Sequence, residues 1–169
     1  MFNLKKFLTF IVAIFFCNGA NSLPLEKKMS NAEERFSHLS THFFQSLGYP
    51  DTFKLIDGAK SDPNYQNDPI GPVAQGNDDS GGPVVCIQDG KIVASSADPT
   101  LVGKDVSNDP IVQKIIIALR TSPDEKIVLK NIESGSNKTI VAWGRKALMG
   151  EKLNKTTHAK FFCYITIEE

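Results

Sequence analysis

Trp143 and Arg145 are the side chains in this 169-residue sequence whose types and spacing best fit ligand binding. They stand two residues apart in segment 139–148, which predicts a strand, so both side chains lie on the same side of it. A guanidinium beside an indole suits a carboxylate with an apolar tail, because arginine can bind both carboxylate oxygens. The alternative is a solvated Arg145 and a Trp143 that packs in the core.

Tyr164 is a third candidate ligand residue, on a strand predicted over residues 160–167. Its phenol could hydrogen-bond a ligand, or it could pack in the core with its hydroxyl bonded. The histidines His38, His42 and His158 are scattered and do not form the pattern of a metal site. We therefore expect no metal and no cofactor.

Segment 79–83 (DSGGP) resembles the nucleophile segment of chymotrypsin-like serine proteases. In that family the glycine-rich turn supplies N–H groups to an oxyanion, and a histidine activates the serine. The histidines upstream of Ser80 are His38 and His42, inside a predicted helix, and no segment resembles the histidine-bearing motif. We therefore expect Ser80 to belong to a turn that leads into a strand, and expect no enzymatic activity.

Residues 1–22 have the features of a secretory signal peptide. Two lysines precede the apolar run 7–16, and Ala20 and Ser22 are the small residues expected at positions −3 and −1 of a cleavage site. An uncleaved anchor is disfavoured because the run is about half the ~20 residues of a spanning helix. A lipoprotein is disfavoured because the residue before Cys17 is not small. We expect a periplasmic or secreted protein.

Cleavage would leave two cysteines, Cys86 and Cys163. An even pair in an exported chain is a candidate disulfide. The alternative, a metal-binding or nucleophilic thiol pair, is weaker because neither cysteine has a second ligand nearby in the sequence.

Composition limits the classes of partner. Lys+Arg and Asp+Glu both number 19, so the formal net charge is zero and nothing indicates a nucleic-acid surface. The length suits one domain, and 41% hydrophobic residues suffice for an ordinary core.

The N-terminal part, residues 23–82, is expected to hold a helix and a loop. Residues 25–47 predict a helix, which packs on its own domain or forms a short homodimer seam. Residues 57–83, rich in Gly, Pro, Asn and Asp, predict a long loop. The helical spacing rests on an apolar stripe formed by Met29, Ala32, Phe36, Leu39 and Phe43.

Residues 83–169 are expected to form the sheet of the same structural domain. Asp89-Gly90 predicts a tight turn between two strands, and Asp109-Pro110 predicts the start of a helix that runs to about residue 121. Three further strands are predicted over 126–132, 139–148 and 160–167. This order predicts an α+β fold, a five-stranded antiparallel sheet with a long N-terminal helix and one crossover helix.

Residues 85–104 (VCIQDGKIVASSADPTLVGK) resemble the core signature of Cache domains, a family of extracytoplasmic sensor domains with a PAS-like sheet. The turn at Asp89-Gly90, the small residues 94–96 and the segment 101–105 (LVGKD) match in order and spacing. The resemblance implies binding of a small molecule such as an organic acid, an amino acid or an amine. Such domains are usually fused to kinases or chemoreceptors, whereas here we expect action through a separate partner, namely a membrane receptor, kinase or transporter.

The family's sheet order also makes the first and last strands neighbours, which implies a disulfide between Cys86 and Cys163. The expected function is therefore small-ligand binding outside the cytoplasm. The alternatives are a protein-interaction module that dimerises through residues 25–47, and a hydrolase that uses Ser80.

Overall fold

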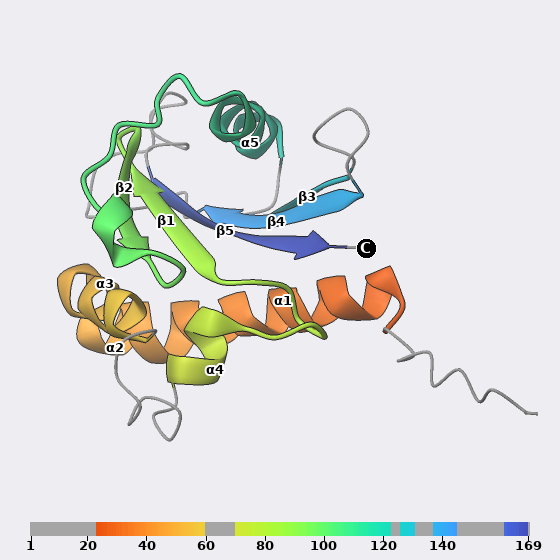
Figure 1. Ribbon diagram of the computed structural model, residues 1–169, viewed down its shortest axis with the longest axis horizontal. Helices are drawn as coiled ribbons and strands as arrows, with labels where there is room; N and C mark the ends of the chain where they lie inside the picture. Colours follow the sequence, from red (N-terminus) through yellow and green to blue (C-terminus); the bar gives the residue numbers. More distant parts are fainter. Residues whose placement is uncertain (1–22, 60–69, 123–125, 131–136, 145–160, 169) are drawn as a thin grey trace, which may run out of the picture.

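The structure is a computed structural model in which five strands form one layer with helices on both sides (Figure 1). None of the helices it describes is long and apolar enough to cross a bilayer. The expected signal peptide lies outside the described residues, which are 23–59, 70–122, 126–130, 137–144 and 161–168.

The sheet is antiparallel throughout, in the order β2-β1-β5-β4-β3. The last strand in sequence therefore lies in the centre, between the first and the fourth. This confirms the predicted five-stranded antiparallel sheet of an α+β fold. The strands are β1 (Val84–Gln88), β2 (Lys91–Ser95), β3 (Lys126–Leu129), β4 (Lys138–Gly144) and β5 (Phe161–Glu168).

Both faces of the sheet are buried, each against its own helices. Alternation along β5 directs Phe161, Cys163 and Ile165 to one core, and Phe162 to the other. The first core is closed by the N-terminal helices and the second by α5 (Pro110–Thr121), which lies on the opposite side of the sheet (Figure 1). A strand covered on both faces is expected to be nearly continuously apolar, and β5 is.

Where the sequence pattern predicts one helix over 25–47, the structure has three consecutive segments. These are α1 (Leu25–His38), a π-helical segment (Leu39–Phe44) and α2 (Gln45–Leu47). The i→i+5 hydrogen bonds of a π turn widen the helix, and here Leu39 and Phe44, five residues apart, both reach the core. Phe44 thus takes the buried position that α-helical spacing assigns to Phe43.

The apolar stripe of these segments packs on its own sheet. Ala32, Phe36 and Leu39 are fully buried there. Phe36 is therefore enclosed within its own domain and is not exposed to form a seam, while a homodimer through other residues of 25–47 stays a prediction.

Two helices occupy parts of the chain that the sequence assigns to a helix end and a loop. α3 (Tyr49–Gly58) begins where Gly48-Tyr49-Pro50 predicts a stop. Proline breaks the interior of a helix, but it is favourable in the first turn, where Pro50 lies. α4 (Ile70–Gln75) lies within the predicted loop 57–83 and buries Ile70 and Ala74.

The β1–β2 hairpin and α5 form as predicted. Asp89 and Gly90 both have positive φ, 49° and 77°, as a tight hairpin turn requires. The Asp109 carboxylate accepts hydrogen bonds from the backbone N–H groups of Ile111 and Val112, so it caps α5.

Segment 101–105 docks on this hairpin through its backbone. The N–H of Gly103 donates to the carbonyl of Ile92 (2.8 Å), and the N–H of Ile92 donates to that of Lys104 (3.0 Å). The two parts of the sequence signature therefore form one hydrogen-bonded unit.

Candidate functional site

Cys86 on β1 and Cys163 on β5 are direct partners in the antiparallel register and form a disulfide, which confirms the predicted pairing. Their Cα atoms lie 4.0 Å apart and both side chains are fully buried. A buried disulfide carries no thiolate, so this pair stabilises the sheet and offers neither a nucleophile nor a metal ligand.

Trp143 is a core residue. The residue is 5% exposed. Its ring stacks on Phe44, with centroids 5.9 Å apart, while Phe161 meets it edge-on at 6.2 Å. Such contacts are the usual packing of buried aromatic rings. The structure therefore gives Trp143 the core position that was the alternative to ligand binding.

Tyr164 lies half-buried on the other face of the sheet, beneath α5. Burial raises the pKa of its phenol, and the negative charge of Asp109 raises it further. Because Trp143 pairs with Cys163 while Ala142 pairs with Tyr164, Trp143 and Tyr164 point to opposite faces. The structure does not bring these two candidates together, and Arg145 lies outside the described residues.

Ser80 is held inside a tight turn. Its hydroxyl donates to the side-chain oxygen of Asn77 (2.9 Å), and the N–H of Asn77 donates to the carbonyl of Gly81 (3.1 Å). Gly81 has φ +78°, and a Cβ there would lie 2.6 Å from Cγ2 of Ile165. The glycine is therefore required both by the backbone and by close packing on β5.

Arg35 fixes this turn from α1. Its buried guanidinium donates to the carbonyl oxygens of Ser80 (2.8 Å) and Gly81 (3.0 Å) in the turn. It also donates to Val73 (3.0 Å) and Ala74 (3.2 Å) in α4. Burial lowers the pKa of Arg35 to about 10, which leaves it charged at neutral pH.

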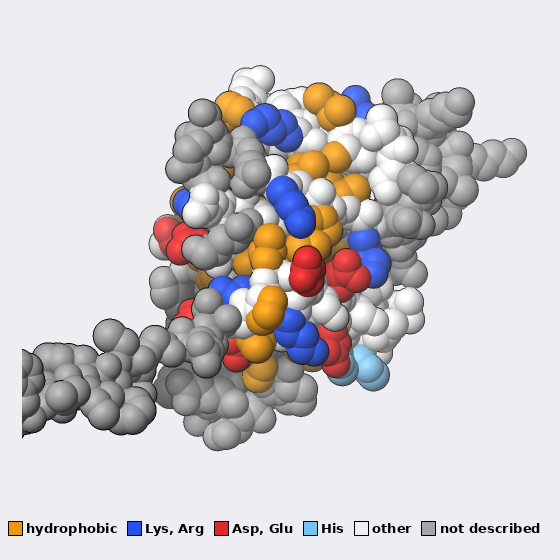
Figure 2. Space-filling view, turned by 90° about the vertical axis from the view of Figure 1, so that its right-hand side faces the viewer, with side chains coloured by type: hydrophobic (Ala, Val, Ile, Leu, Met, Phe, Trp, Pro, Cys, Tyr) orange, Lys and Arg blue, Asp and Glu red, His pale blue; other side chains and the backbone are white. Residues whose placement is uncertain are grey.

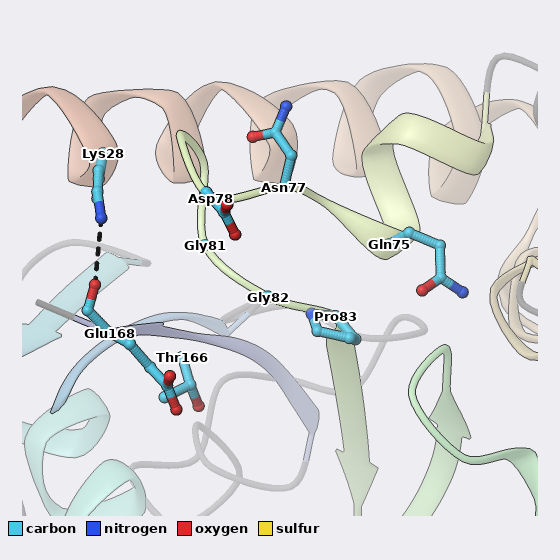
Figure 3. Close-up of a pocket in the computed structure, with 9 residues that line it drawn as sticks. All are labelled: Lys28, Gln75, Asn77, Asp78, Gly81, Gly82, Pro83, Thr166 and Glu168. Carbon is cyan, nitrogen blue, oxygen red and sulfur yellow. Dashed lines mark hydrogen bonds between the residues drawn. The ribbon is translucent and has the colours of Figure 1, made fainter. Parts of the chain in front are cut away.

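A cavity of about 690 Å³ opens between α1, the turn and the end of β5. In Figure 3, Lys28 points from α1 toward the end of β5, and Asp78 points into the space between them. The cavity is lined by Lys28, Gln75, Asn77, Asp78, Gly81, Gly82, Pro83, Thr166 and Glu168.

Lys28 is the main positive charge of this cavity. The residue is 8% exposed, and its ammonium donates to the backbone carbonyl of Glu168 at 3.2 Å. An ammonium has three N–H donors, and a buried cation is costly unless its donors are satisfied. The site therefore suits a ligand that brings a negatively charged acceptor to Lys28.

Comparison with family models, with curated proteins and with solved structures found no match to this chain. Its function therefore has to be argued from its own residues.

The sequence analysis missed Lys28, although its spacing is informative. Lys28, Ala32, Arg35 and Leu39 follow one another at intervals of four, three and four, which places two basic residues among the buried positions of α1. Basic residues on the buried side of an amphipathic helix are unusual, since charges are seldom buried without partners. These two basic residues at buried positions are the sequence signal from which the cavity could have been predicted.

Proposed function

We propose that this chain is an exported sensor-type binding domain of the Cache class, which binds a small carboxylate and acts through a membrane receptor, kinase or transporter. Its strand order supports the class, because the first and last strands are neighbours as the resemblance implies. The docking of segment 101–105 on the hairpin supports it too. Since one fold can host many functions, the choice of function rests on the site.

The observation that carries the proposal is the ammonium of the buried residue Lys28 in the cavity wall. A ligand carboxylate would accept hydrogen bonds from it and relieve the cost of its burial. The carboxylate of Asp78 points into the same space (Figure 3) and would suit a ligand amino group. An organic acid or an amino acid fits this pair of charges better than a simple amine.

The proposal includes no enzymatic activity. Ser80, the one residue set in a nucleophile-like motif, uses its hydroxyl to donate to Asn77, and Arg35 holds its carbonyl. Both contacts support a structural turn. We expect Ser80→Ala to leave ligand binding intact, and loss of a hydrolytic activity in that variant would contradict the proposal.

Export is supported by residues 1–22 and by the disulfide, because disulfides persist mainly in oxidising compartments. Mass spectrometry of the protein recovered outside the cytoplasm should give a chain that begins at residue 23. Recovery of the uncleaved chain in the cytoplasm, with free Cys86 and Cys163, would contradict it.

The ligand is best sought by a thermal-unfolding screen of residues 23–169 against amino acids, short carboxylates and amines. Trp143 fluorescence monitors the unfolding. A ligand at a hundred times its Kd stabilises by about 2.7 kcal/mol, which raises Tm by several degrees in a domain of this size. Lys28→Met should abolish the shift. Lys27→Met, a change at an exposed neighbour on α1, is the matched control and should retain it.

Two results would overturn the assignment of this cavity. A shift that survives Lys28→Met but is lost in Tyr164→Phe would move the site to the α5 face of the sheet. No shift with any amino acid, carboxylate or amine of the screen would remove the ligand-binding function itself.

A further inference from the structure

His38 and His42 lie side by side on the N-terminal helices. Their rings are stacked with centroids 5.2 Å apart and planes inclined by 26°. Both side chains are exposed, and histidine is visible at the surface in Figure 2. The sequence analysis treated these residues as scattered, whereas the helix brings their imidazoles into contact.

The backbone beneath the pair is anchored by the core. His38 ends α1 and His42 lies in the π-helical segment that follows. Within that segment Leu39 and Phe44 are buried against the sheet, so the two histidines project from a fixed surface. π turns within helices occur frequently at functional sites.

The spacing of the rings suits a shared metal ion. Imidazole nitrogen binds Zn²⁺ at about 2.0–2.1 Å, so two rings on one ion at a tetrahedral angle have centroids roughly 5 Å apart. The observed separation of 5.2 Å is close to that value, although the rings are now stacked. Because imidazole nitrogens bind a metal in the plane of the ring, both side chains must rotate to direct a nitrogen at one ion, and this requires no movement of the helix. Imidazole ligands favour zinc, copper and nickel over calcium and magnesium.

We propose that His38 and His42 together bind a divalent transition-metal ion. Among the described residues there is no cluster of three or more ligating side chains, so water completes the coordination of the ion at this exposed position. The site lies at the end of α1 and in the π-helical segment, away from Lys28 and the cavity, and does not depend on the proposed small-molecule function.

Calorimetric titration of the full chain with zinc chloride tests the site. Cys17→Ser is introduced throughout, because a free thiol would compete for zinc. We expect one ion per chain, with His38→Ala and His42→Ala each weakening the affinity roughly tenfold or more, since the second imidazole binds intramolecularly. His158→Ala removes the same group elsewhere and is the matched control, with unchanged affinity expected.

The NMR signals of the histidine rings test the site without substitution of His38 or His42. Zinc should move the ring protons of His38 and His42 together and leave those of His158 in place. The proposal is overturned if the two alanine variants bind zinc as well as the parent does, or if His158→Ala abolishes binding. It is equally overturned if zinc leaves the His38 and His42 signals unmoved.

Discussion

Lys28 and Arg35 lie two turns apart on the side of α1 that faces the sheet, and both donate hydrogen bonds to main-chain carbonyl oxygens. Arg35 satisfies its donors in the turn and in α4, whereas Lys28 opens onto the cavity. One helix therefore closes the core and also forms a wall of the candidate site. Removal of Arg35 is therefore expected to lower stability, whereas removal of Lys28 is expected to abolish ligand binding.

Arg35→Met should lower the free energy of unfolding by about 2–4 kcal/mol, because four carbonyl oxygens each lose one hydrogen-bond donor. Urea unfolding followed by Trp143 fluorescence measures the loss, since this sole tryptophan is buried in the core. Arg120→Met, on the exposed side of α5, is the control and should cost little. Equal stability of the two variants would contradict the assigned role of Arg35.

Replacing Cys86 and Cys163 together by alanine should lower the free energy of unfolding by about 4 kcal/mol in the chain-entropy model, since their sequence separation is 77 residues. Urea unfolding of the parent with and without reductant should show a loss of the same order. Labelling of both thiols in the unreduced native protein is the result that would refute the disulfide.

Gly81→Ala should lower the free energy of unfolding by about 2–4 kcal/mol. The residue has a positive φ, and the added Cβ would lie 2.6 Å from the Ile165 side chain. Gly103→Ala is the matched control. Gly103 also has a positive φ, +90°, but no atom lies within 4 Å of a Cβ built there. In urea unfolding we expect the control to lose about 1 kcal/mol of unfolding free energy. Similar losses for both variants would show that the packing of Gly81 on β5 is loose.

Asp57 should make stability depend on pH. Burial raises the pKa of its carboxyl above 3.8, although the hydrogen bond from the Ser95 N–H opposes this. The folded state therefore holds the proton at higher pH than the unfolded state, and stability falls as pH rises through the range just above 3.8. Asp57→Asn removes this dependence.

The difference in unfolding free energy between Asp57→Asn and the parent should therefore rise from pH 3 to pH 6. Asp51→Asn, at an exposed position of the same helix, is the control. A difference that falls over this range would show that the hydrogen bond from Ser95 outweighs burial.

The parts of the fold that the sequence predicts well depend on local chemistry. Asp89-Gly90 sets the hairpin turn and Asp109 caps α5 through its own neighbours, so a short stretch of sequence suffices for each. The strand order also follows the expectation from the resemblance, and with it the pairing of Cys86 and Cys163.

The parts that the sequence does not predict depend on distant contacts. The π turn exists because Leu39 and Phe44 both reach the core, which α-helical spacing alone does not indicate. α4 is held by Arg35, whose partners lie 38 to 46 residues away. The cavity likewise joins residues from α1, the turn and β5, which no local pattern brings together.

The central position of β5 has a consequence for the order of assembly. The β1–β2 hairpin and the β3–β4 pair lie on opposite sides of β5 and contact each other in the sheet only through it. During synthesis these two halves are made well before the strand that joins them, so the sheet cannot close until β5 has emerged. The export proposed above would benefit from that arrangement, because a chain that folds late stays longer in a state able to cross a membrane.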